Sequence, residues 1–392
     1  MTLVDGFDRE ALSNGLEAAG ADGWLLFDFR GLNPVAARVL GFGGLGSRRL
    51  FVYLPRAGEP VAVAHKIELQ ALEAFPGRVV PYARWEELHA ALATIVDGHT
   101  VAMEVSREDA VPYLDRVPAG VVQLIEKLGG TVVSSGDLVT HFAARWSAAE
   151  REGHVHAAEM LATIAREIIA QTVRAAAEAP RESAVQEKVI RRIHEAGLVF
   201  DHPPIVAFGP NAADPHYEPV PGRDAALRAD QTVLIDLWGG SELGTVFADQ
   251  TWMGFSGDQP PERVLEVWTV VRDARDAAID LVTRAVAAGR ALRGFEIDRA
   301  ARTVIEGAGY GEFFVHRTGH SIDRDLHGSG PHCDDYETRD QRELVEGVGF
   351  SVEPGIYLPG EFGVRSEVNM FWGPEGAVVT PGAIQRDLIL PV

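Results

Sequence analysis

The sequence contains a single cysteine, Cys333, among 392 residues, which excludes an internal disulfide framework. A chain without disulfides fits a reducing compartment. The amino-terminal segment lacks the basic and apolar regions of a signal peptide, and no apolar run approaches the roughly 20 residues needed to span a bilayer. We therefore expect a cytoplasmic protein with no membrane partner.

Runs of positive charge are also missing. Lys and Arg number 36 against 57 Asp and Glu, which gives a formal net charge of −21 and a pI near 5.0. No cluster of basic residues is long enough to follow a phosphate backbone, so nucleic acid is a poor partner. The excess of acid favours the binding of cations instead.

Two common functional motifs are absent as well. The glycine-rich segment GFGGLGS at 41–47 precedes a predicted strand, whereas a dinucleotide-binding loop follows a strand and opens a helix. His316 and His320 lie four residues apart, but the Thr-Gly between them favours strand and turn over helix, and no HExxH sequence occurs. These absences argue against a nucleotide site at 41–47 and against a helical zinc protease.

The most informative stretch is VLIDLWGGSELGTVFADQTWMG, residues 233–254, which predicts two strands joined by a glycine-rich turn. We expect the turn to be centred on Glu242 and Leu243. Asp236 and Asp249 would then be cross-strand partners on one face, with Cβ atoms roughly 4.5 to 5.5 Å apart. Two carboxylates at that distance repel by about 4 kcal/mol at an effective dielectric near 20, so the pair calls for a cation.

A second segment, GFSVEPGIYLPGEFGVRSEVNMF at 349–371, repeats this arrangement. A three-residue loop at 359–361 would place Glu353 opposite Glu367. The two hairpins then look like two halves of one site. Their acids together would need about four positive charges, which two divalent ions supply.

Residues 1–145 are predicted to form an α/β domain, because apolar strands alternate there with amphipathic helices. Helices are expected at 85–96 and 119–130, the second ending in a Gly pair suited to a C-cap. The expected strands are 23–29, 48–55, 60–66, 100–106 and 131–136.

A second domain is predicted over residues 146–392. Ser147 and Glu150 match a capping box, which opens a helix running to about 179, where Pro180 stops it. A second helix, a short strand with a loop that carries His216, and the first acidic hairpin follow.

The same order then recurs in the carboxy-terminal half. Helices at 261–288 and 295–309 precede a short strand with a histidine-rich loop, and the second acidic hairpin follows. An internal duplication that encloses a shared site explains this order.

These features resemble the pita-bread metallopeptidases, the family of prolidase, aminopeptidase P and methionine aminopeptidase, with creatinase as a metal-free relative. The resemblance covers roughly 145–392 and rests on EPGIY at Glu353, on GVRSE with Arg365, and on five filled ligand positions. It implies an α+β pita-bread catalytic domain that follows an α/β domain similar to that of the proline-specific members. It also implies a homodimer.

The resemblance assigns roles to individual residues. Glu353 would carry a proton to the leaving nitrogen, and Arg365 would hold a ligand carboxylate. His216 and His327 would bind the substrate and stabilise the oxyanion. Tyr357 shares the face of Glu353 by strand parity and belongs to the substrate side. The ligands of a dinuclear centre would be Asp236, Asp249, His320, Glu353 and Glu367.

Some positions depart from the family pattern. The two aspartates are farther apart in sequence than in most members, by one residue on each arm of the hairpin, which leaves their facing unchanged. After His320, Ser321 and Asp323 replace the usual glycines, and Gly328 stands where an acid often follows the second histidine. These differences bear on the shape of the substrate pocket. His316 and His332 are interpreted as structural or peripheral.

The expected function is hydrolysis of Xaa-Pro bonds in short peptides with proline at the second position. Oxygen-rich coordination with one imidazole favours two manganese ions and permits cobalt or zinc, and such ions can activate a shared water. A metal-free hydrolase of the creatinase type, or a binding protein that has lost catalysis, is disfavoured by the intact ligand positions.

An Xaa-Pro dipeptidase is favoured over an Xaa-Pro aminopeptidase. A dipeptidase must recognise a free carboxylate, which calls for a guanidinium group in bidentate geometry. The segment YETRDQRELVEG offers Arg339 and Arg342 as candidates for this role.

Overall fold

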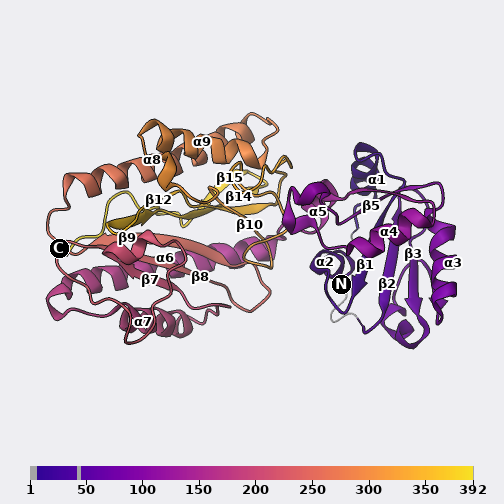
Figure 1. Ribbon diagram of the computed structural model, residues 1–392, viewed down its shortest axis with the longest axis horizontal. Coiled ribbons are helices and arrows are strands. Elements are labelled where there is room, and N and C mark those ends of the chain that lie inside the picture. The colour runs from indigo at the N-terminus through magenta and orange to yellow at the C-terminus, as the bar shows by residue number, and fades with distance from the viewer. Residues whose placement is uncertain (1–6, 42–45, 392) are drawn as a thin grey trace. The chain divides into compact units, whose positions relative to one another are not determined.

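The computed structural model describes residues 7–41 and 46–391, and the chain divides into two compact units, Met1–Ala143 and Ala144–Val392 (Figure 1). Each unit has hydrophobic cores of its own. Residues 42–45 of the glycine-rich segment at 41–47 lie outside the described residues. Among the helices described, none combines the length and apolar character needed to cross a membrane.

The first unit is a six-stranded mixed sheet with helices on both faces. Its strand order is β4-β3-β2-β1-β5-β6. Alternate side chains of β1 point to opposite faces, so Trp24 packs with α1, α2 and α5, whereas Leu25 packs with α3 and α4. The helices are α1 (Arg9–Ala18), α2 (Pro34–Leu40), α3 (Trp85–Val96), α4 (Ala119–Lys127) and α5 (Gly136–Phe142). The strands are β1 (Gly23–Phe29), β2 (Arg49–Pro55), β3 (Val61–His65), β4 (Arg78–Tyr82), β5 (Thr100–Met103) and β6 (Thr131–Ser134).

The strands and helices predicted for this unit all form, within a few residues of the expected bounds. The sequence pattern misses α1, α2, α5 and β4. Helices α2 and α5 have seven residues each, about two turns, which is too short to show a clear helical period. Strand β4 contains Pro81, which the sheet accepts because β4 lies at its edge.

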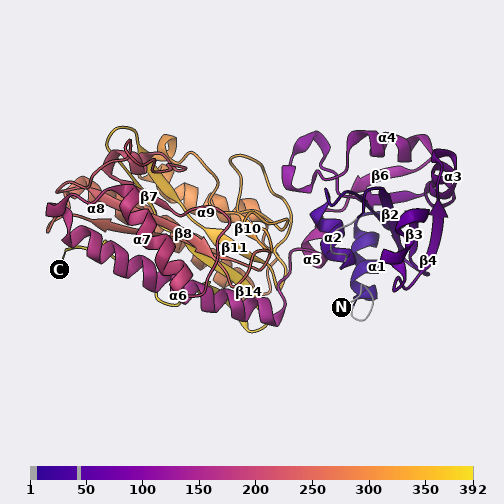
Figure 2. The same cartoon turned by 90° about the horizontal axis from the view of Figure 1, so that it is seen from below.

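In the second unit, two pairs of helices enclose the strands. Helices α6 (Ala148–Arg174) and α7 (Glu182–Glu195) lie on one side, and α8 (Glu262–Ala287) and α9 (Gly294–Gly307) lie on the other (Figures 1 and 2). Each pair of helices precedes an acidic hairpin, so the repeated order expected from the sequence is present. Helix α6 begins with the predicted capping box but ends short of the expected residue 179, because a separate short turn of 3-10 helix follows it.

The strands of the second unit form three small sheets. The short strand expected between the helix at 295–309 and the histidine-rich loop does not form, because residues 310–315 contain no strand. The first sheet contains β7 (Ile205–Phe208), β8 (Thr232–Gly239) and β9 (Ala248–Phe255). The second contains β10 (Ser321–Ile322), β11 (Gly349–Val352), β14 (Val368–Gly373) and β15 (Gly376–Thr380). The third pairs β12 (Gly355–Leu358) with β13 (Phe362–Arg365).

The register of the first hairpin differs from the expected one. Asp236 pairs with Thr251, and Asp249 pairs with Trp238, so the two acids are diagonal rather than directly opposed. The turn lies later than expected because Gly244, with a φ of 79°, takes the left-handed position. The resulting shift is by an even number of residues, so both acids still point to the same face.

The register of the second hairpin is the predicted one. Gly355 pairs with Arg365 between β12 and β13, and Val352 pairs with Val368 between β11 and β14. The β12–β13 and β11–β14 pairings therefore share one antiparallel register. In that register Glu353, which lies between β11 and β12, is opposite Glu367, which lies between β13 and β14. This unit therefore presents two acidic hairpins, as the sequence predicts.

A buried histidine links α6 to the strands. His154 is fully buried, with Nδ1 3.0 Å from the carbonyl oxygen of Phe247 and Nε2 2.8 Å from Thr380 Oγ1. Burial lowers its pKa from 6.5 to about 4. Between the two pKa values, this histidine is protonated in the unfolded chain and neutral in the folded chain. The contribution of buried His154 to the free energy of unfolding is therefore complete above the unfolded pKa and is lost as the pH falls toward 4.

We predict that His154→Gln makes the protein less sensitive to acid. Glutamine keeps a donor and an acceptor but cannot be protonated. Between pH 6.5 and 4, the unfolding free energy should therefore fall less steeply than in the wild type, by about 1.4 kcal/mol per pH unit. Urea unfolding of both proteins across this pH range measures the difference. If the unfolding free energies of the two proteins change with pH in parallel, the lowered pKa of His154 is contradicted.

Candidate metal centre

The strands of the second unit bring four acids that are distant in sequence to one region. Asp236 on β8 is 7% exposed, and Asp249 on β9 is 5% exposed. Glu353 follows β11 and is half-buried, whereas Glu367 precedes β14 and is 4% exposed. Acids rarely lie at such depth unless they are paired or bind a metal.

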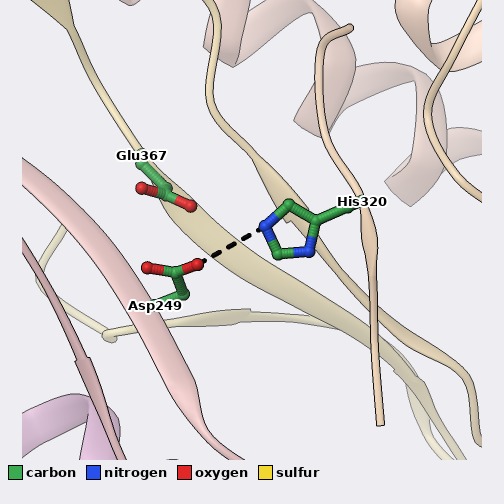
Figure 3. Close-up of side chains that lie close together, drawn as sticks. All are labelled: Asp249, His320 and Glu367. Atoms are coloured by element: carbon green, nitrogen blue, oxygen red, sulfur yellow. Dashed lines mark ion pairs between the residues drawn. The ribbon is translucent and has the colours of Figure 1, made fainter. Parts of the chain in front are cut away.

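Three of the predicted ligands converge most closely. One ligand atom from each of Asp249, His320 and Glu367 lies within 4.8 Å of the others, and all three residues are buried. Figure 3 shows the imidazole of His320 facing the two carboxylates. His320 Nε2 lies 3.4 Å from Asp249 Oδ2 and 3.4 Å from Glu353 Oε1, so Glu353 joins the same cluster.

The protonation of His320 does not explain this cluster. Its Nδ1 lies 3.1 Å from the carbonyl oxygen of Ser321, which places the ring N–H on Nδ1. Burial, with the charges of His327 and Arg317, lowers the pKa of His320 well below its usual value, so the ring is neutral. The lone pair of Nε2 therefore faces two carboxylate oxygens. A cation between them would turn this repulsion into coordination, and metal-binding histidines commonly donate their other N–H to a backbone carbonyl.

The acids also repel one another. Burial, with the charges of Asp236 and Glu353, raises the pKa of Asp249 well above its usual value. Burial raises the pKa of Glu353 to about 7, against the opposing effect of Arg365. Burial, with the charges of Asp249 and Glu353, also raises the pKa of Glu367. Without a cation, these acids therefore hold protons more tightly than isolated carboxylates do.

Two oxygen atoms in the cluster also call for a cation. Glu367 Oε1 is buried and has no hydrogen-bond partner among the described residues. Thr251 Oγ1 lies 2.9 Å from both Asp236 Oδ1 and Glu367 Oε2, yet a hydroxyl group has one proton to donate. Divalent ions would satisfy these oxygens and neutralise the acids, so the donor set fits a metal centre of carboxylates and one imidazole.

Arg365 supplies positive charge to this cluster. It is 3% exposed, and its Nη2 donates to Asp236 Oδ2 at 2.6 Å while its Nε donates to Thr251 Oγ1 at 2.9 Å. Its Nη1 donates to the hydroxyl of Tyr357 at 3.0 Å and to the carbonyl oxygen of Pro215 at 3.3 Å. The guanidinium group thus ties one acid of the predicted ligand set to the loop that follows β7.

Tyr357 and His316 form a network beside Arg365. His316 Nδ1 lies 2.7 Å from the carbonyl oxygen of Arg317 and so carries the ring proton, and the hydroxyl of Tyr357 donates to His316 Nε2 at 2.7 Å. Burial raises the pKa of Tyr357 to about 12 and lowers that of His316 to about 3, so both groups are neutral near pH 7. Of the two roles expected for His316, structural or peripheral, these contacts favour the structural one, because its ring supports the tyrosine that contacts Arg365.

The two histidines assigned to the substrate lie next to residues that contact the acids. The rings of His320 and His327 have centroids 4.3 Å apart and are nearly perpendicular. His216 belongs to the loop after β7 and follows Pro215, whose carbonyl oxygen accepts from Arg365. Both His216 and His327 are exposed, so a ligand can reach them.

The two candidate arginines differ in how they are engaged. Arg342 is buried, and its Nε and Nη2 donate to the two carboxylate oxygens of Asp340. Its Nη1 and Nη2 also donate to the carbonyl oxygens of Ser329 and Gly330. This guanidinium group is a structural tie, which corrects its expected role in reading the substrate. Arg339 is exposed and keeps that assignment as a proposal.

Sequence reasoning misses Thr251 and the contact between His316 and Tyr357. Thr251 follows Asp249 at the two-residue period of a strand, so its place on the acidic face could have been read from the sequence. His316 carries no comparable signal, because residues 314–320 form no helix or strand and only the tertiary fold brings the ring to Tyr357. His332 is buried and its Nδ1 accepts from the backbone N–H of Ser321, as expected of a structural residue.

Comparison with known sequences gives one family and several relatives. The profile of metallopeptidase family M24 matches residues 152–371, more than half of the chain. The chain is 28% identical over 346 residues to the probable dipeptidase PepE of Mycobacterium tuberculosis (strain ATCC 25618 / H37Rv), which covers 86% of this chain and 85% of that protein. It is 37% identical over 166 residues to the Xaa-Pro dipeptidase of Lactobacillus delbrueckii subsp. lactis, which covers 42% of this chain and 40% of that protein.

Solved structures share the fold over nearly the whole chain. Dipeptidase PepE from Mycobacterium ulcerans has a TM-score of 0.74 at 25% identity and covers 97% of this chain and 96% of that chain. The X-Pro aminopeptidase from Thermotoga maritima MSB8 has a TM-score of 0.64 at 24% identity and covers 98% of this chain and 99% of that chain. The predicted fold, an α/β domain followed by an α+β pita-bread domain, is thereby confirmed.

We predict that the affinity of the cluster for Mn²⁺ falls steeply on acidification. The pKa of Glu353 is about 7 and those of Asp249 and Glu367 are raised, so bound metal must displace protons. Each displaced proton weakens binding about tenfold per pH unit. Calorimetric titration of chelator-treated protein with Mn²⁺ between about pH 6 and 8 measures this slope. An affinity that does not change over this range contradicts the ligand set.

Proposed function

This chain belongs to metallopeptidase family M24, and we propose that it is a dinuclear-metal Xaa-Pro dipeptidase acting on short peptides with proline at the second position. The observation that carries the proposal is the buried cluster of Asp249, His320 and Glu367, whose ligand atoms converge within 4.8 Å. The printed names of two relatives, a probable dipeptidase and an Xaa-Pro dipeptidase, support the choice of substrate.

Five side chains would hold the two ions: Asp236, Asp249, His320, Glu353 and Glu367. We take manganese as the metal, with cobalt and zinc as alternatives, because the donors are oxygens apart from one imidazole. When bound, the ions polarise the scissile carbonyl group and lower the pKa of water. The bond from Arg365 to Asp236 and the bond from His320 to the Ser321 carbonyl hold two of these ligands in place.

Glu353 is the proposed proton carrier. Its Oε1 accepts from Ser351 Oγ at 2.9 Å, which fixes the carboxylate beside His320. From this position it takes a proton from the attacking water and delivers it to the leaving nitrogen of proline. His216 and His327 bind the substrate and stabilise the negative charge that develops on the carbonyl oxygen. Tyr357 is assigned to the same substrate side.

Arg339 is the proposed reader of the free carboxylate of a dipeptide. Its guanidinium group is 3.6 Å from Asp335 and lies over the ring of Phe295, 4.7 Å from the ring centre. An exposed guanidinium on such a loop can turn to meet a carboxylate in bidentate geometry. Arg299 contacts the same aspartate and the same ring, so it provides a matched control.

We also propose a cytoplasmic homodimer. The single cysteine in 392 residues supports a reducing compartment. The dimer rests on the resemblance to the proline-specific members of the family.

We predict that His327→Ala lowers the turnover of Ala-Pro by about 100-fold or more while leaving the metal content normal, because His327 acts on the substrate. Glu353→Gln should lower turnover and also weaken metal binding, since it removes a charged ligand together with the proton carrier. Steady-state kinetics combined with elemental analysis of each protein separates the two effects. A His327→Ala protein that loses its metal would instead place this histidine among the ligands.

We predict that the wild-type protein cleaves Ala-Pro faster than Ala-Pro-Ala, because the dipeptide offers a carboxylate to Arg339. Arg339→Ala should raise the KM for Ala-Pro by about 10-fold or more, as expected for the loss of a charged hydrogen bond. It should also reduce the preference for Ala-Pro over Ala-Pro-Ala. Arg299→Ala should leave the preference unchanged. Faster cleavage of the tripeptide by the wild type would assign the chain to the Xaa-Pro aminopeptidases.

A further inference from the structure

The loop that carries His216 is held by a buried carboxylate outside the metal cluster. Glu182 is the first residue of α7 and is fully buried. Helix α7 contacts β7, and the loop, residues 209–225, begins where β7 ends. The carboxylate of Glu182 accepts hydrogen bonds of 2.7 to 3.1 Å from the backbone N–H groups of Phe208 and Ala225 and from the side chains of Asn211 and Tyr217.

These donors span the whole loop. Phe208 precedes it, Asn211 lies in its first turn, Tyr217 lies in its middle and Ala225 ends it. One buried carboxylate thus fixes the loop at four points. A carboxylate that accepts several such bonds holds its donors more firmly than a neutral acceptor does.

A second acid closes the end of the loop against α7. Asp224 is 4% exposed and accepts from the backbone N–H of Ser183 at 3.0 Å, from Ser183 Oγ at 2.7 Å and from Arg181 Nε at 3.0 Å. Burial opposes its ionisation, but the bonds from Ser183 and Arg181 outweigh burial and lower the pKa of Asp224. The loop therefore ends in a fixed position.

The opposite side of the loop packs against the second acidic hairpin. A Cβ atom at Gly363 on β13 would lie 1.8 Å from the carbonyl oxygen of Ala212, so the two backbones are in direct contact there. Farther along the loop, Arg365 Nη1 donates to the carbonyl oxygen of Pro215 at 3.3 Å. The loop is thus held between Glu182 and the strand that carries Arg365.

His216 lies between the two residues through which these contacts act. Pro215 on one side is bonded to Arg365, and Tyr217 on the other donates to Glu182 Oε2 at 2.7 Å. His216 itself is exposed, and its backbone N–H donates to Asp214 Oδ1 at 3.2 Å. The position of its backbone is therefore determined by its neighbours in the chain.

We infer that Glu182 is a positioning residue, which fixes the His216 loop so that the imidazole meets the substrate at the metal cluster. The inference rests on the proposed function, in which His216 faces the substrate. If Glu182 only stabilised the fold, the effect of replacing it on kcat would be the same whether or not His216 is present. The inference predicts that this effect depends on His216.

The test is a double-mutant cycle between Glu182→Gln and His216→Ala, with kcat and KM measured on Ala-Pro and the metal content determined for each protein. Glutamine keeps the shape of the side chain but turns an NH₂ group toward N–H and O–H donors. We expect Glu182→Gln to lower kcat by about 10- to 100-fold, with KM changed less and the metal retained. In that background His216→Ala should lower kcat little further, because both changes act through one imidazole.

Tyr217→Phe is a milder second variant, which tests the same inference even if Glu182→Gln fails to fold. It removes only the hydroxyl bond beside His216 and keeps the aromatic ring. We expect kcat to fall by about 2- to 10-fold, with the same coupling to His216→Ala.

Glu104→Gln is the matched control for neutralising a buried carboxylate. Glu104 lies in the first unit and accepts from the side chains of Trp24, Asn33 and Ser135. This variant should leave kcat on Ala-Pro and the effect of His216→Ala unchanged.

The outcomes separate the inference from the function on which it rests. If the decrease in kcat of the double variant equals the product of the decreases caused by Glu182→Gln and His216→Ala alone, the inference is overturned. An unchanged kcat in His216→Ala would overturn the inference as well, whereas the proposed cleavage of Xaa-Pro bonds would stand. Failure of the wild-type protein to cleave Ala-Pro would refute the proposed function itself, and the inference with it.

Discussion

The mutual repulsion of buried carboxylates is the constraint on which the rest of this structure depends. Two unit charges 4 Å apart repel by about 4 kcal/mol even at an effective dielectric near 20, and burial raises the pKa values of Asp249, Glu353 and Glu367 accordingly. Arg365 offsets part of this charge, but His320 is neutral and turns a lone pair toward the acids. Divalent cations resolve the conflict, which is why the arrangement fits a metal centre.

The fold holds the acids together despite this repulsion by placing them on paired strands. Strands β8 and β9 carry one pair of acids, and the second pair lies where the β12–β13 ladder passes into the β11–β14 ladder in one register. Helices α6 to α9 cover the strands with apolar side chains, so the strands cannot separate without exposing a large core. Contacts around the acids add to this rigidity: a Cβ at Gly355 would lie 2.5 Å from the hydroxyl of Tyr357, so the ring packs directly on the hairpin.

The sequence predicts which face of a strand a residue occupies better than it predicts its partners. The two-residue period keeps Asp236 and Asp249 on one face even though the turn at Gly244 shifts their register. Long helices and central strands are also predictable, whereas the seven-residue helices α2 and α5 leave too weak a pattern. Side-chain partners that are distant in sequence depend on the tertiary fold: nothing local to the sequence reveals that the hydroxyl of Tyr357 donates to His316.

Anomalous diffraction from crystals of the protein grown with MnCl₂ tests the central claim most directly. Data collected at the manganese edge locate each ion independently of any assumption about its ligands. The account predicts two anomalous peaks per chain, both among the five proposed ligands Asp236, Asp249, His320, Glu353 and Glu367. A cluster without manganese in crystals whose protein cleaves Ala-Pro, or peaks at other residues alone, would contradict it.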